Sequence, residues 1–243
     1  TIDEISRVGI FEGKRKTQLA EYFDVSGDLD DQQIVWQGDL GGVHWVGAKM
    51  VSGTMRVEGN VGRHLGSEMT GGTIHVTGDA GDWVGGEMKG GQITVQGNAG
   101  HLVGAAYRGS ARGMTGGTIE IHGSAGNEIG HTMRRGLIAV GAKVGDLVGF
   151  NLLAGSIFLF GETGIRHGAG MRRGTLAFFS GEMPSMLPTF RYACRFRSPA
   201  INLITRQLAE NGFEVAEAHR DAMFQLYHGD MIEGGRGEIL VRS

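Results

Sequence analysis

The chain has 243 residues, of which 45 are glycine and only 3 are proline, and it is 40% hydrophobic. This hydrophobic share excludes a disordered glycine-rich tract, and the glycines follow no three-residue collagen period. The net charge of -3 favours neither nucleic acid nor an anionic membrane surface, and the single cysteine suits a reducing cytosol. The sequence shows no apolar run long enough to span a membrane and no basic-then-apolar signal at its start. We therefore expect a cytoplasmic protein without nucleic-acid or membrane partners.

Residues 1–28 are irregular and include a charged stretch from Glu12 to Lys16. An imperfect coil follows, in which Leu29 is the first residue and Ile34 and Trp36 are predicted to lie on inner rows. An atypical first coil is expected at the capped end of a stacked structure, because an open end exposes a sheet edge. We predict that 1–28 is an N-terminal lead-in that caps this end.

Between residues 50 and 183 the chain repeats itself every 19 residues. The same repeat position is held by an apolar anchor residue, and only one step between anchors, of 26 residues, departs from the period. The longer step contains a seven-residue insertion inside 104–113. The anchors are Met50, Met69, Met88, Met114, Met133, Leu152 and Met171. A fixed period of this length predicts stacked units that pack only against their neighbours.

Glycines keep constant positions within the repeat, at three, twelve and sixteen residues after the anchors. Glycine suits corners where the chain turns with positive φ or where backbone packs against backbone. We predict structural corners at Gly53, Gly72, Gly91, Gly117, Gly136, Gly155, Gly174, Gly62, Gly81, Gly100, Gly126, Gly145, Gly164, Gly66, Gly85, Gly104, Gly130, Gly149 and Gly168.

Each repeat also contains a short alternating segment that predicts a β-strand. Apolar residues such as Ile119 and Ile121 stand five and seven residues after the anchor, with mixed residues between them. We therefore predict an all-β fold over 29–183, a right-handed parallel β-helix with about 19 residues per coil and seven to eight coils. In this fold Ile119→Asp, on an inner row, should be far more damaging than a change at the outward Glu120.

Residues 184–243 lose the period and form a predicted C-terminal appendage. Ser198 and Pro199 are a typical N-cap and first residue of a helix, and apolar residues recur at helical spacing over 200–210. The segment 239–241 is strand-like. We expect this appendage, with its helix and terminal strand, to cap the second end of the β-helix or to dock on a partner.

The sequence carries no strong catalytic or metal-binding motif. It contains nine histidines but no HxH, HExxH, CxxC or Gly-x-Ser-x-Gly pattern. His64, His101, His131 and His167 stand 14, 13, 17 and 15 residues after their anchors, so they do not share a repeat position. We therefore predict exposed or hydrogen-bonded histidines, with no catalytic residue and no metal site in this chain.

Arginines gather in two places along the chain. One group occupies the same repeat positions two coils apart, which is roughly 10 Å along the axis, and comprises Arg134, Arg135, Arg172 and Arg173. A second group, Arg191, Arg195 and Arg197, follows in the appendage. Both groups have two interpretations: a solvated or ion-paired face, or a patch for an acidic partner or a polyanionic cofactor tail.

The insertion at 105–112 is a further candidate for binding. Insertions in stacked repeats emerge as loops on one face, and such loops often bind partners. A surface loop that is merely tolerated is the alternative interpretation.

The glycine-rich coils resemble a known family. The segments GGTIHVTGDAGDWVG at 71–85 and GGQITVQGNAGHLVG at 90–104 resemble the C-terminal GXGXG β-helix domain of the glutamate synthase large subunit. The whole chain, including GDMIEGGRGEILV at 229–241, resembles the β-helix subunit family of formylmethanofuran dehydrogenase, above all its counterpart in the formyltransferase/hydrolase complex of methylotrophs.

This resemblance implies a non-catalytic scaffold subunit of a one-carbon complex. In such a complex an amidohydrolase-like subunit, which holds a metal, hydrolyses formyl-methanofuran or formyl-methylofuran to formate. A formyltransferase subunit exchanges the formyl group with tetrahydromethanopterin, and a third partner resembles a molybdopterin-dependent oxidoreductase. The resemblance assigns no bound cofactor to the β-helix subunit itself. Because methanofuran-type cofactors carry glutamates, the first arginine group is a candidate for steering such a tail.

Two alternatives stay open at this point. The chain is also compatible with the β-helix subunit of an archaeal-type tungsten or molybdenum formylmethanofuran dehydrogenase. From another class, a β-helix acyltransferase or a γ-carbonic-anhydrase-like enzyme would share the coiled architecture. The period of 19 and the histidines out of phase disfavour that second class, which is built on a six-residue sub-period.

Overall fold

The structure is a computed structural model that describes residues 1–28 and 31–243, and it divides the chain into two compact units, Thr1–Ile34 and Val35–Ser243. The first unit contains α1 (Ile2–Ser6), the antiparallel hairpin of β1 (Gly9–Glu12) and β2 (Arg15–Gln18), and the short helix η1 (Leu19–Glu21). Among its described residues only Thr17 and Leu19 are buried. The predicted anchor Leu29 lies outside the described residues, and the capping role of 1–28 stays a prediction.

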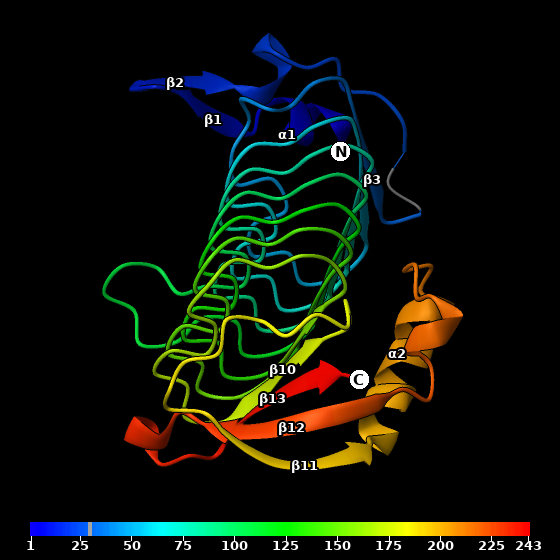
Figure 1. Ribbon diagram of the computed structural model, residues 1–243. Coiled ribbons are helices and arrows are strands. Elements are labelled where there is room, and N and C mark those ends of the chain that lie inside the picture. Colours follow the sequence, from blue (N-terminus) through cyan, green and yellow to red (C-terminus); the bar gives the residue numbers. More distant parts are fainter. Residues whose placement is uncertain (29–30) are drawn as a thin grey trace. The chain divides into compact units, whose positions relative to one another are not determined.

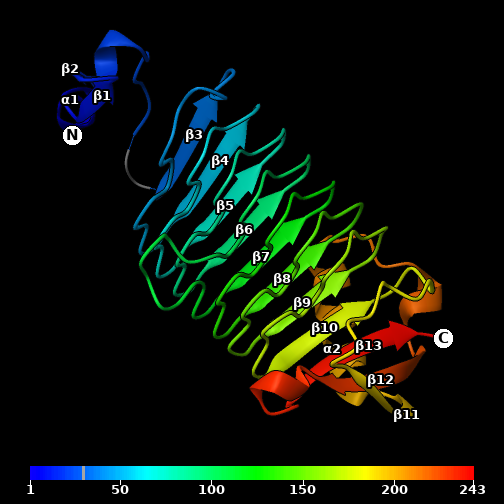
Figure 2. The same cartoon turned by 60° about the vertical axis from the view of Figure 1, so that its left-hand side comes forward.

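The second unit is built on one long sheet (Figures 1 and 2). Seven of its strands come from successive coils and pair in parallel with their neighbours. They are β4 (Thr54–Glu58), β5 (Thr73–Val76), β6 (Gln92–Val95), β7 (Thr118–Ile121), β8 (Leu137–Val140), β9 (Ser156–Leu159) and β10 (Gly174–Phe178). β3 (Gln33–Gln37) ends the sheet on one side. The predicted all-β fold, a parallel β-helix, is confirmed.

The register of the coils follows the 19-residue period and places like residues on top of one another. Ile74 pairs with Ile93, Ile93 with Ile119, and Ile119 with Ile138, and all four are completely buried. A second wall of the coil is held by single parallel bridges, such as that between Val61 and Ala80. The first coil departs from this pattern. Ile34, which was predicted to lie on an inner row, is 50% exposed.

The glycine rows meet two different physical requirements. Gly104, sixteen residues after its anchor, has a φ of +67°, which a residue with a side chain adopts only with strain. Gly62, twelve residues after its anchor, is required by close packing instead. A Cβ there would lie 2.5 Å from the carbonyl oxygen of Val43 in the preceding coil. The coils can therefore approach each other at this corner only if the residue has no side chain.

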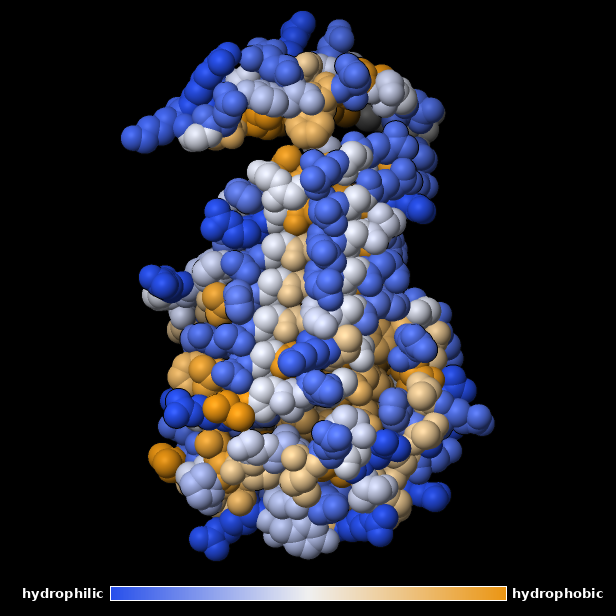
Figure 3. Space-filling view, turned by 45° about the horizontal axis from the view of Figure 1, so that its top comes forward, coloured by the Kyte–Doolittle hydropathy of each residue, from blue (hydrophilic) through white to orange (hydrophobic). Residues whose placement is uncertain are grey.

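Polar side chains stack at one corner and hydrogen-bond the backbone of the next coil. An oxygen of Asp82 accepts a bond from the His101 N–H at 2.7 Å, and His101 Nδ1 accepts one from the Asn127 N–H at 2.9 Å. Asn127 Oδ1 continues the row by accepting from the Asp146 N–H at 2.9 Å. Figure 3 shows such rows as parallel columns of like-coloured side chains along the coils. The row satisfies backbone donors that the short strands leave unpaired.

The strands of the appendage extend the sheet of the coils beyond β10. Its elements are β11 (Arg191–Arg197), α2 (Pro199–Glu210), η2 (Glu217–His219), β12 (Met223–Gly229), η3 (Met231–Glu233) and β13 (Gly237–Arg242). β13 pairs in parallel with β10, whereas β12 and β11 are added in antiparallel. The predicted helix and terminal strand are confirmed: Ser198 caps α2 by accepting from the Ile201 N–H at 3.3 Å.

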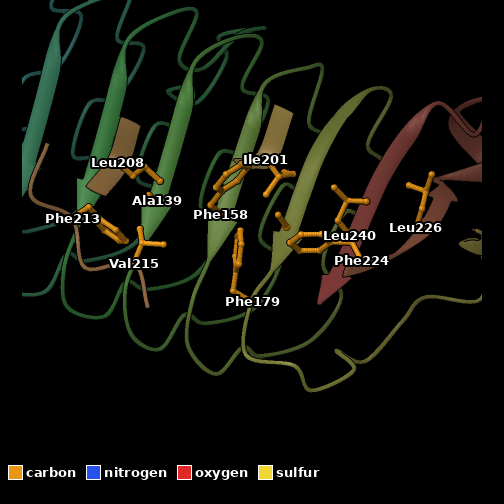
Figure 4. Close-up of a cluster of buried hydrophobic side chains, with 11 residues drawn as sticks. Ala139, Phe158, Phe179, Ile201, Leu208, Phe213, Val215, Phe224, Leu226 and Leu240 are labelled. Atoms are coloured by element: carbon orange, nitrogen blue, oxygen red, sulfur yellow. The ribbon is translucent and has the colours of Figure 1, made fainter. Parts of the chain in front are cut away.

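The helix of the appendage covers the outer face of the sheet, which corrects one expectation. Glu120, predicted to point outward into solvent, is completely buried. Its carboxylate accepts a hydrogen bond from the Asn211 amide at 3.0 Å, and burial raises its pKa. Figure 4 shows the apolar cluster in which side chains of the sheet pack against side chains of the appendage. This cluster comprises Ala139, Phe158, Ala177, Phe179, Ile201, Leu208, Phe213, Val215, Phe224, Leu226 and Leu240.

Candidate functional site

Three arginines predicted as a patch, with one from the appendage, surround a surface hollow of about 320 Å³. The hollow is lined by Arg134, Leu153, Arg172, Arg173 and Arg236. Arg135, also predicted for this patch, is exposed but does not line the hollow. The structure therefore brings together most of the predicted group and adds Arg236, which stands 63 residues after Arg173 in the sequence.

The repeat sets the position of the residues that line the hollow. Arg134, Leu153 and Arg172 each follow directly after an anchor, and so they stand above one another in successive coils. Their backbone N–H groups donate to carbonyl oxygens of the preceding coil at 2.8 Å in every case. Arg236 reaches the same place because β13 pairs with β10, with Gly237 opposite Gly174. The guanidinium groups are thus presented by a regular backbone frame.

The hollow keeps an excess of positive charge. Arg172 Nε contacts Glu233 Oε2 at 3.1 Å, but both side chains are partly exposed, so this pair contributes little to stability. Among the described residues, Arg134, Arg173 and Arg236 make no ion pair. Several guanidinium groups around one hollow suit a ligand with more than one carboxylate or phosphate, because each group offers a planar pair of donors.

The insertion is fastened to a stack of aromatic rings, and its loop projects from the coils in Figure 1. The Trp45 and His64 rings stack with centroids 4.1 Å apart, and His64 stacks on Trp83 at 5.3 Å. Tyr107 of the insertion lies 5.5 Å from the His64 ring, and its hydroxyl donates to Ser67 Oγ at 2.6 Å. Burial lowers the pKa of His64 and raises that of Tyr107. The root of the loop is therefore part of the packed surface.

A second hollow, of about 270 Å³, lies between the outer face of the sheet and the appendage. It is lined by His122, Gly141, Phe160, Phe213, Glu214, Ala216 and His219. Burial lowers the pKa of both His122 and His219, so both imidazoles favour the neutral form. The described residues contain no group of three or more His, Cys, Asp or Glu side chains that could hold a metal ion. Neither do they contain a helix with the length and hydropathy needed to cross a bilayer.

Comparison with known proteins places the chain in a family. Residues 44–190 match the model of the GXGXG motif family. A chain in the crystal structure of the formyltransferase/hydrolase complex (FhcABCD) from Methylorubrum extorquens, in complex with methylofuran, is 34% identical with a TM-score of 0.91. The alignment covers 100% of this chain and 90% of that chain. The chain belongs to the β-helix subunit family of the formyltransferase/hydrolase complex. No curated protein gives a significant match.

For this member of the β-helix subunit family, local sequence patterns do not indicate two features of the surface. Arg236 joins the hollow through strand pairing with β10, which no local pattern predicts. The aromatic stack is missed when the repeat positions of the histidines are compared only with those of other histidines, because the neighbours of His64 in the stack are tryptophans. Trp45, His64 and Trp83 are spaced by the repeat length and all have φ between +58° and +67°, so the period itself is a usable signal.

Proposed function

We propose that the chain is the non-catalytic scaffold subunit of a complex that hydrolyses a formyl-methanofuran or formyl-methylofuran to formate and exchanges the formyl group with tetrahydromethanopterin. The observation that carries this proposal is the match to a chain of a formyltransferase/hydrolase complex over 100% of this chain, at 34% identity. The partners would be an amidohydrolase-like subunit with its metal, a formyltransferase subunit and a molybdopterin-oxidoreductase-like subunit. Catalysis would belong to the first two.

The repeated frame suits a scaffold, because each coil fixes the next through backbone pairing. Parallel pairing is continuous from β4 to β10. From the second regular coil onward, the residues on the inner rows are buried. Surfaces on such a frame hold fixed positions relative to one another along the coils. A scaffold of this kind would keep two partner active sites at a fixed separation.

The scaffold role is tested by co-expressing the chain with the three partner subunits and purifying the assembly. We expect all four subunits to co-purify, and the rate of formyl transfer coupled to hydrolysis to fall when this chain is omitted. If the remaining subunits assemble and turn over at the same rate without it, the scaffold role is wrong.

We further propose that the arginine hollow receives the glutamyl tail of the cofactor. Three of its arginines, Arg134, Arg173 and Arg236, have no acidic partner among the described residues. Exposed charge pairs contribute roughly 0.2–1 kcal/mol each. Removing three such contacts therefore costs roughly 0.6–3 kcal/mol, which corresponds to roughly 3–150-fold in affinity.

The test is the triple variant Arg134→Ala/Arg173→Ala/Arg236→Ala in the assembled complex, with Arg135→Ala as the matched control outside the hollow. We expect the triple variant to raise the apparent KM for the cofactor at least about threefold and to lose cofactor during gel filtration. The control should behave like the native complex in both assays. An unchanged KM together with full retention in the triple variant would remove the tail-binding role and leave the scaffold role untouched.

A further inference from the structure

The outermost strand of the sheet, β11, is open on one side. The strand order begins β11-β12-β13-β10, so β11 has a neighbour on only one edge among the described residues. Figures 1 and 2 both show it as the last strand of the sheet. Of its seven residues only Phe196 is even partly buried. The strand therefore offers unpaired backbone N–H and C=O groups to a further strand.

The open edge carries unbalanced positive charge. Arg191, Arg195 and Arg197 lie on this one strand and make no ion pair with the described residues. The residues opposite them on β12 are His228, Gln225 and Met223, none of which is acidic. Arg195 is held in place by its Nε, which donates to Ser243 Oγ at 2.8 Å. The edge is thus polar, positive and partly preorganised.

The charge also argues against a second copy of the chain as the occupant. Antiparallel pairing of two β11 strands centred on Cys194 would bring Arg191 of one copy close to Arg197 of the other. Like charges opposite each other destabilise a sheet. Arginines and the irregular register between Tyr192 and Cys194 also protect an edge from aggregation. If protection were their whole role, the edge would stay open in the assembled complex.

We propose that β11 is a docking strand, to which an extended acidic segment of a partner subunit adds as the next strand of the sheet. Strand addition satisfies the free backbone groups and gives affinity, while the arginines select a segment that carries carboxylates. This inference rests on the proposed function only in so far as it requires a complex with partner subunits. The surface is distinct from the arginine hollow, because none of its arginines lines that hollow.

Cys194 gives a direct test, because it is the chain's single cysteine, lies in β11 and is exposed. The rate of its modification by a maleimide is measured by mass spectrometry in the isolated chain and in the assembled complex. We expect at least tenfold slower modification in the complex. We also expect slower amide hydrogen exchange along 191–197. Both effects should weaken as salt is raised, since the attraction is electrostatic.

Charge reversal identifies the partner chemistry. Arg195→Glu/Arg197→Glu should restore the modification rate of Cys194 in the complex to within about twofold of the free chain. The matched control is Arg206→Glu, an exposed arginine of α2, which should leave the protection unchanged. Melting curves of the isolated variants verify that both remain folded.

Each outcome decides the inference. A complex in which Cys194 reacts as fast as in the free chain shows that the edge is only protected against aggregation. Protection that survives the charge reversal rules out an acidic segment. Failure to form any complex refutes the proposed function and the docking strand together, whereas the first two results overturn the docking strand alone.

Discussion

Replacement of Phe158 by alanine tests whether the appendage covers the outer face of the sheet. Phe158 lies on β9, is completely buried and has the Phe179 ring 5.5 Å away. An aromatic side chain buries roughly 150–250 Å², which at about 25 cal/mol per Å² corresponds to roughly 4–6 kcal/mol as an upper estimate. Measured Phe-to-Ala changes in protein cores lie at about 3–5 kcal/mol. We therefore expect a loss of about 3–5 kcal/mol in the free energy of unfolding.

The matched control is His75→Ala, which removes a side chain from the same outward row at an exposed position on β5. It should change stability by no more than about 0.5 kcal/mol. Thermal denaturation followed by circular dichroism would show the difference, since a unit of this size shifts by about 2–4 °C per kcal/mol. Phe158→Ala should thus lower Tm by roughly 6–20 °C. Equal small shifts for the two variants would mean that the appendage does not cover the sheet.

Two further changes probe buried polarity and corner packing. Burial raises the pKa of Glu120, so at intermediate pH the folded chain keeps a proton that the unfolded chain has lost. The contribution of Glu120 to the free energy of unfolding is therefore fully present below the unfolded pKa of about 4.3 and is lost as pH rises through the raised pKa of the folded state. Urea titrations at several pH values should show that Glu120→Gln flattens this pH dependence of the free energy of unfolding, whereas Glu182→Gln, at an exposed position, should not. An unchanged pH dependence in Glu120→Gln would contradict the raised pKa of Glu120. Gly62→Ala should lower Tm, because its Cβ would press on the Val43 carbonyl, while Gly42→Ala, with nothing within 4 Å, should leave Tm unchanged or slightly raised. Equal Tm values for these two alanine variants would refute the packing argument.

The coils could be predicted because their contacts repeat the sequence period. A residue such as Ile119 pairs with the residue at the same position of the next coil, so periodicity alone fixes register, strand and inner row. The local signals for α2 were equally sufficient, since an N-cap serine and a first-turn proline act within one helical turn. These elements need no knowledge of distant partners.

The placement of the appendage could not be predicted from periodicity, because it depends on contacts between residues far apart in the sequence. Glu120 bonds to Asn211, and β10 pairs with β13, across separations that no repeat relates. A weaker signal did exist. The outward row changes from Arg56 and His75 in early coils to Ala139 and Phe158 in later ones. An apolar outward residue needs a cover, and the appendage supplies it.

The same reasoning explains where binding surfaces arise on this molecule. Within the regular coils, backbone pairing and the rows of polar side chains satisfy most backbone hydrogen-bonding groups. The row of Arg134, Leu153 and Arg172 forms no hollow by itself. It becomes a hollow where the appendage adds Arg236 beside it. The free strand edge likewise occurs where the sheet ends, at β11. A stacked repeat leaves unsatisfied chemistry mainly where its regularity is interrupted, so the free sheet edge and the junction between the coils and the appendage are where these surfaces arise.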